Sequence, residues 1–85
     1  MTPAEALADV RGYASANRIR VDAHALQRMR ERGVAFRDLR HARANATKCT
    51  PGDENRWRVE GPDLAGDDVT AIVVLEDGVV VVTVF

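Results

Sequence analysis

Three side chains that can handle a phosphate group, His24, Arg28 and Arg32, lie four residues apart. Residues with this spacing form one ridge along an α-helix. Histidine titrates near neutral pH and serves as general acid or base, and arginine donates paired hydrogen bonds to phosphate oxygens. Metal-free RNA cleavage needs a base for the 2′-hydroxyl, a cation at the scissile phosphate and an acid for the leaving oxygen. The ridge is therefore a candidate catalytic site.

A purely structural role for the same ridge stays open. The helical wheel puts it on the flank of the apolar stripe, with Arg32 nearest the core boundary. The two arginines could pair with acidic groups from the second half of the chain, and His24 could bind a backbone carbonyl near the helix start.

Further cations are candidate nucleic-acid contacts. A following helix carries three on one face, and two more alternate with Trp57 along a strand, on the face opposite the tryptophan. The alternatives are a solvated helix face for the first group, and acidic partners under a helix layer for the second. Trp57 itself fits the core, with base stacking as the sharper alternative. These candidate contacts are Arg37, Arg40, His41, Arg56 and Arg58.

A metal site built from His24, His41 and Cys49 lacks any short ligand pair, so we expect no metal and no cofactor. Cys49 is the only cysteine, which excludes an intrachain disulfide and argues against a small secreted scaffold. No residue nearby in the sequence would activate it as a nucleophile.

Charge is distributed unevenly along the chain. Residues 18–48 carry nine basic and three acidic groups, a net charge of +6, whereas residues 49–85 carry two basic and eight acidic groups, a net charge of −6. Such a split creates a basic face for an anionic partner, unless the two halves neutralise each other in the fold. The sequence shows no signal peptide and no membrane-spanning run, so we expect a cytoplasmic protein.

The 85 residues suffice for a single domain, residues 1–85. The sequence predicts helices at about 3–16, 23–32 and 35–46, with a capping box at Thr2–Glu5, Asp22 as a cap and Gly33 as a left-handed helix end. It predicts strands at 18–22, 56–60, 69–75 and 79–85, a turn at 50–53, and a two-residue hairpin at Asp77–Gly78. The valine-rich last strand is predicted to be buried on both faces or central, with an edge position that pairs with another copy as the alternative.

The apolar spacing of the second and third helices predicts their core-facing residues, which are Ala25, Leu26, Met29, Phe36, Leu39, Ala42 and Ala46. The order of elements favours an α+β fold, with N-terminal helices packed on one face of a small, mainly antiparallel sheet.

The ridge belongs to a longer pattern. The string His24-Ala25-x-x-Arg28-Met29-x-x-Arg32-Gly33-Val34 resembles the HA-x-x-R-M-x-x-R-G-I/V motif of the family called domain of unknown function 4258, and the closing VVTVF resembles that family's last strand. The resemblance covers residues 19–85 and leaves out the first helix. That family is similar to RelE/BrnT-like toxins, whose helices pack on an antiparallel sheet that carries a ribonuclease site.

The resemblance implies the toxin of a toxin–antitoxin pair, acting on RNA as a metal-free endoribonuclease and bound by an acidic antitoxin protein. His24, Arg28 and Arg32 match the motif, and Thr83 matches the closing strand as a further nucleic-acid contact. The alternative is a non-catalytic module that binds a protein or nucleic acid through the same surface.

Overall fold

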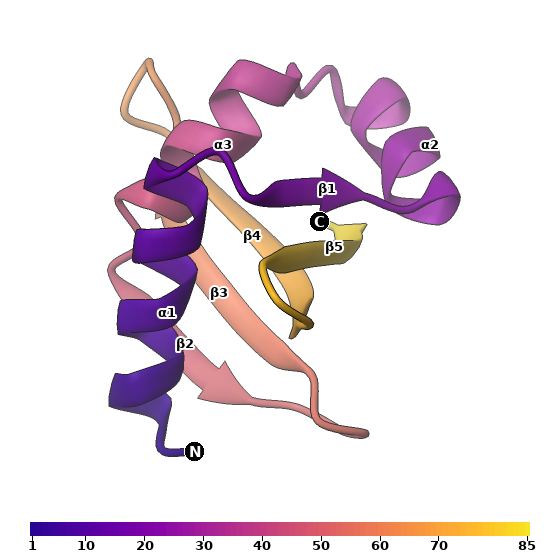
Figure 1. The fold of residues 1–85 in the computed structure, drawn as a ribbon. Coiled ribbons are helices and arrows are strands. Elements are labelled where there is room, and N and C mark those ends of the chain that lie inside the picture. Colours follow the sequence, from indigo (N-terminus) through magenta and orange to yellow (C-terminus); the bar gives the residue numbers. More distant parts are fainter.

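A computed structural model describes all 85 residues as three helices and one five-stranded sheet (Figure 1). The strand order is β1-β5-β4-β3-β2; β1 runs parallel to β5, and every other neighbouring pair is antiparallel. The predicted α+β class and mainly antiparallel sheet are therefore confirmed. The elements are α1 Pro3–Ser15, β1 Ile19–Val21, α2 Ala23–Arg32, α3 Phe36–Ala44, β2 Lys48–Pro51, β3 Trp57–Pro62, β4 Asp68–Leu75 and β5 Val79–Val84.

The helices cover one face of the sheet. Alternate strand residues such as Val59, Val73 and Val81 are buried, and they form one cluster with helix residues such as Val10 and Leu39. Because successive side chains of a strand point to opposite faces, a single cluster means that all three helices pack on the same face. The other face carries no second layer. In Figure 1, α1 runs alongside β2, and α2 lies beyond the end of β1.

Local sequence signals set the helix ends as predicted. Thr2 and Glu5 form the capping box of α1, and the Asp22 carboxylate accepts the Ala25 N–H at 2.8 Å to begin α2. Gly33 ends α2 in the left-handed conformation with φ 69°. The Val34 N–H then donates to the Met29 carbonyl at 2.9 Å, which turns the chain sharply into α3.

Two predictions about chain turns were wrong. The segment expected as a turn at 50–53 continues as edge strand β2, and the turn follows at 52–56. The final hairpin has three residues, Glu76 to Gly78, between the paired Leu75 and Val79, where two were predicted. A short strand ending in proline has no apolar alternation, so its sequence reads as a turn.

The last strand was predicted to be buried on both faces or central. β5 lies between β1 and β4, so it is an inner strand. Val79, Val81 and Val84 are buried, whereas Val80 and Val82 on the other face are half-buried. The valine run thus marks an inner strand with one covered face.

None of the three helices combines the length and the apolar character that a membrane span requires.

Candidate nucleic-acid interface

Helix α2 presents the predicted ridge largely to solvent. His24 and Arg32 are exposed, and the Arg28 side chain keeps 32% of its surface accessible. The prediction that Arg32 lies at the core boundary is wrong, because Arg28 takes that place. Arg28 also pairs with Glu31 on its own helix at 3.6 Å, which leaves His24 and Arg32 without an ionic partner.

The α2–α3 turn gathers exposed cations at one rigid corner. Arg30 and Arg32 occupy the last turn of α2, and Arg37 lies in the first turn of α3. The backbone between them is fixed, because Val34 is tied to Met29 and packs against the core. We call the arginines of α2 and the start of α3 the basic corner, which consists of the exposed Arg30, Arg32 and Arg37 and the half-buried Arg28.

Acidic residues of the second half do not neutralise the basic corner. They pair elsewhere: Asp77 with Arg18 at 2.6 Å, and Glu76 with Arg20 at 3.5 Å. Glu54 pairs with the neighbouring Arg56 at 3.8 Å.

Within the two helices, Asp38 accepts the backbone N–H of Leu64 at 3.2 Å. Arg30, Arg32 and Arg37 form no salt bridge. The alternative that the two halves of the chain cancel each other's charge is therefore wrong for this surface.

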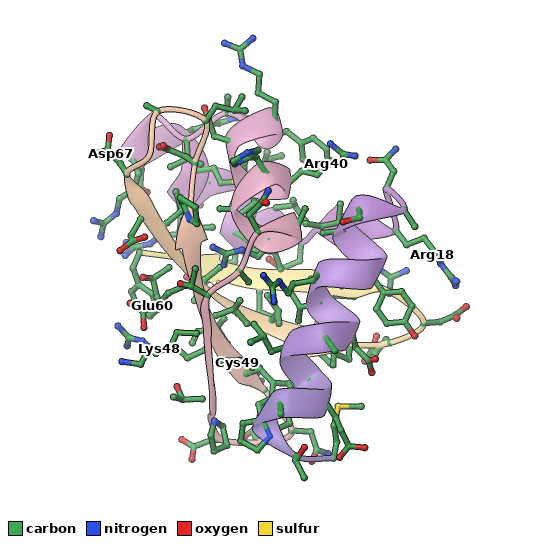
Figure 2. The ribbon with its side chains drawn as sticks, turned by 90° about the vertical axis from the view of Figure 1, so that its left-hand side faces the viewer. Arg18, Arg40, Lys48, Cys49, Glu60 and Asp67 are labelled. Carbon is green, nitrogen blue, oxygen red and sulfur yellow. The ribbon has the colours of Figure 1, made fainter.

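The rest of α3 faces inward and differs from expectation. The His41 ring Nδ1 lies 3.0 Å from the Pro62 carbonyl oxygen, so His41 ties α3 to the end of β3. Arg40 is half-buried, its buried Nε has no hydrogen-bond partner, and its side chain points toward α1 (Figure 2). The structure thus separates these two candidate contacts from Arg37 and the basic corner.

Arg43 is a buried structural arginine that the sequence analysis did not single out. Its side chain is fully inaccessible, and its guanidinium donates to the carbonyl oxygens of Val59, at 2.9 Å, and Val69. Burial lowers the pKa of Arg43 to about 10, partly offset by the nearby Glu60. The signal was available, because Arg43 is one turn from the core residue Leu39.

The strand candidates lie on the uncovered face of the sheet. Thr83 pairs with Ile72, and Ile72 pairs with Arg58, so the three form one row across β5, β4 and β3. The Arg58 guanidinium lies over the Phe85 ring, 5.3 Å from its centre. Lys48 and Glu60 project from the same face, away from α1 (Figure 2). Arg56 precedes β3 and is exposed in the turn.

Most of the predicted site residues therefore form two groups: the ridge and Arg37 on the helical layer, and Arg58 and Thr83 on the uncovered sheet face. Arg40, His41 and Arg56 belong to neither group. One backbone hydrogen bond links the start of α2 to β5, the strand that carries Thr83. The Asp22 N–H donates to the Val81 carbonyl at 3.1 Å, and beyond this bond the chain enters α2 while β5 continues to Thr83.

No cluster of three or more His, Cys, Asp or Glu side chains is arranged to hold a metal ion. Cys49 is buried on the covered face, and this burial raises the pKa of its thiol. Trp57 is half-buried and packs against the core, as its simpler interpretation predicted. Comparisons with protein-family models, with curated proteins and with solved structures find no match to this chain.

Proposed function

We propose that this protein binds RNA at the basic corner and acts as the toxin of a toxin–antitoxin pair, a metal-free endoribonuclease. One observation carries the RNA-binding part: Arg30, Arg32 and Arg37 are exposed and unpaired although the second half of the chain is rich in acidic groups. Unpaired arginines on a rigid scaffold keep their hydrogen-bond donors free for phosphate oxygens.

The α+β class of the fold supports the proposal. Helices packed on a mainly antiparallel sheet are what a RelE/BrnT-like toxin requires, and the motif resemblance named that arrangement. An acidic antitoxin protein would cover the basic corner and block RNA.

The cleavage step assigns roles to the ridge. His24 accepts the proton of the RNA 2′-hydroxyl while its oxygen attacks phosphorus, and Arg28 and Arg32 hold the phosphate oxygens as negative charge develops. The bond to the 5′-oxygen breaks, and this oxygen takes a proton from protonated His24 or from water. The products are a 2′,3′-cyclic phosphate and a 5′-hydroxyl. Arg37 adjoins the ridge and is assigned as a further RNA contact. Arg40, His41, Arg56, Arg58 and Thr83 lie apart from the basic corner and are given no role in this step.

The second candidate is an RNA- or protein-binding module without catalysis. It is favoured by the environment of His24, whose ring makes no hydrogen bond that would hold it in one orientation. A general base normally needs such an orienting partner. Binding through the basic corner is common to both candidates, and only the chemistry separates them.

The test compares an unpaired arginine with a paired one. Arg32→Ala is expected to weaken binding of a short RNA roughly fivefold and to reduce the slope of log affinity against log salt by about 0.7, because one phosphate contact is lost. Arg20→Ala is the matched control, since Arg20 is also exposed but pairs with Glu76. Fluorescence anisotropy at several salt concentrations measures both. Equal losses in the two variants would contradict binding at the basic corner.

Catalysis is tested with His24→Ala. Wild-type protein is expected to cleave RNA in the presence of EDTA and to arrest growth when expressed alone. His24→Ala is expected to lose both effects while keeping its circular dichroism spectrum and its RNA affinity. Bound but intact RNA, with normal growth, would establish the binding module in place of the toxin.

A further inference from the structure

Phe36 is an aromatic side chain held open to solvent inside the basic corner. It is the first residue of α3, 45% of its surface is accessible, and Arg32 and Arg37 flank it in sequence. The helical pattern predicted Phe36 in the core, and this prediction was wrong. The core side of α3 is taken by Leu39, Ala42 and Arg43, which leaves Phe36 on the flank.

The exposure of Phe36 is set by a rigid backbone. Two residues before it, Val34 is anchored to the core and hydrogen-bonded to the end of α2. The Ala35 carbonyl then accepts the N–H of Leu39 at 3.1 Å and starts α3. An aromatic ring is thus presented in one place, at the conformational cost of only two side-chain torsions.

Phe85 provides an internal comparison. Its exposed fraction, 47%, is nearly the same, but its ring is occupied by the Arg58 guanidinium. The other cation–π contact of the protein joins Arg18 and Tyr13. Neither contact involves Phe36, so no guanidinium group of the protein covers its ring, and the exposed part of the ring is open to a planar ligand.

We propose that Phe36 stacks on an unpaired base, and that the basic corner selects single-stranded over double-stranded RNA; this inference rests on the RNA binding proposed above. In a duplex the bases are stacked on one another and paired, so they cannot reach a side chain on a convex helical corner. In a single strand they splay outward while arginines hold the backbone on either side. Stacking on an aromatic ring tolerates any base, so the selection is for strandedness rather than for sequence.

The experiment distinguishes stacking on the aromatic ring of Phe36 from simple contact with an apolar side chain. Affinity is measured by fluorescence anisotropy for one short RNA as a single strand and as a duplex of the same sequence. Phe36→Leu is expected to weaken single-strand binding roughly fivefold and duplex binding little, and Phe36→Trp is expected to retain wild-type affinity. Phe85→Leu, the matched control on the uncovered sheet face, is expected to bind as wild type. Circular dichroism confirms that each variant is folded.

A 2-aminopurine base placed in the single strand reports stacking directly. Its fluorescence is expected to be quenched by wild type and by Phe36→Trp but not by Phe36→Leu. The proposal is overturned if Phe36→Leu binds and quenches like wild type, if duplex RNA binds as tightly as the single strand, or if Phe85→Leu carries the loss. In those cases RNA binding itself survives. Absence of any binding by the wild type would instead overturn the proposed function and this inference together.

Discussion

The two ends of helix α3 carry arginines in opposite environments. At its start, Arg37 is exposed, unpaired and next to the exposed Phe36; two turns later, Arg43 is fully buried and bonded to the carbonyls of β3 and β4. The same residue type thus serves a surface at one end and holds the helix to the sheet at the other. What decides the role is the side of the helix: Arg43 lies on the side that faces the sheet, and Arg37 lies on a side that faces solvent.

The C-terminal end of α3, which contains Arg43 and which we call the docked end, makes a close contact with β3 that depends on Gly61. A β-carbon at this position of β3 would overlap the Ala42 carbonyl and lie 2.9 Å from the Ala46 α-carbon. α3 therefore rests directly on the strand backbone, and the long Arg43 side chain is enclosed beneath it. At the basic corner Arg30, Arg32 and Arg37 lie on the exposed sides of their helices, so they stay hydrated and available.

The largest expected effect comes from breaking the docked end with Gly61→Ala. Because the added methyl group would meet backbone on both sides, α3 must move, and we expect the free energy of unfolding to fall by about 3 kcal/mol in urea denaturation. The matched control is Gly12→Ala on α1, where nothing lies within 4 Å of the added group. That change should stabilise the protein by about 0.5 kcal/mol. Similar losses in both variants would show that α3 is not seated on Gly61.

The next effect separates the charge of Arg43 from its volume. Arg43→Ala leaves a cavity beneath α3 and is expected to lower the free energy of unfolding by about 2 kcal/mol. Arg43→Met keeps most of the volume and removes the buried charge, so we expect it to be at least as stable as wild type at pH 7.

The pKa of Arg43 gives the expected pH dependence its sign. A base with a lowered pKa in the folded state resists protonation there, so its charge opposes folding at every pH below about 10. This cost shrinks as the pH rises from about 10 toward the pKa of an unfolded arginine, where the stabilities of wild type and Arg43→Met should converge. If Arg43→Met were as unstable as Arg43→Ala at pH 7, the hydrogen bonds to Val59 and Val69 would outweigh the burial cost.

Features that depend on local residues, and not on packing between elements, are the ones that the sequence predicts well. Helix ends depend on local residues, and Thr2, Asp22 and Gly33 were placed correctly because each acts on its own backbone neighbours. The alternating strands and the inner position of β5 followed from apolar periodicity in the same way. These signals need no knowledge of which element packs on which.

The failures share a different cause. Leu26 and Phe36 were predicted to be in the core, but they are 41% and 45% exposed, and Arg43 is buried in their stead. Helical spacing defines a stripe only to within about one residue on either side, and the sheet decides which flank is covered. The short edge strand β2 was missed because its four residues carry no apolar alternation, and only their pairing with β3 makes them a strand.

The candidate site was likewise predicted well within one helix and poorly between elements. The ridge on α2 was correctly placed on one helix, but the separation of Thr83 and Arg58 from Arg37 depends on the two faces of the sheet, which no spacing reveals. That Arg30, Arg32 and Arg37 are unpaired also required the structure, since it depends on where Glu76 and Asp77 find their partners.

The smallest expected effect tests whether α1, which lies outside the motif resemblance, belongs to the same folded unit. α1 packs on α3 and β2, and it helps to cover Cys49. Because burial raises the pKa of this thiol, its reactive thiolate is scarce, and we expect it to react with a thiol reagent at pH 8 at least roughly tenfold more slowly than a cysteine on the uncovered face. Thr50→Cys in a Cys49→Ala background supplies that comparison from the neighbouring residue of the same strand.

The pH dependence of stability should follow the same thiol. A raised pKa in the folded state means that stability is complete below the pKa of the unfolded thiol and declines as the pH rises above it. Between pH 8 and about pH 10 the urea midpoint of wild type should therefore fall slightly more than that of Cys49→Ala. Equal reactivity of the two cysteines at pH 8 would mean that α1 opens readily. The folded unit would then begin at β1, where the motif resemblance begins, and α1 would be a separate segment whose packing does not stabilise the basic corner.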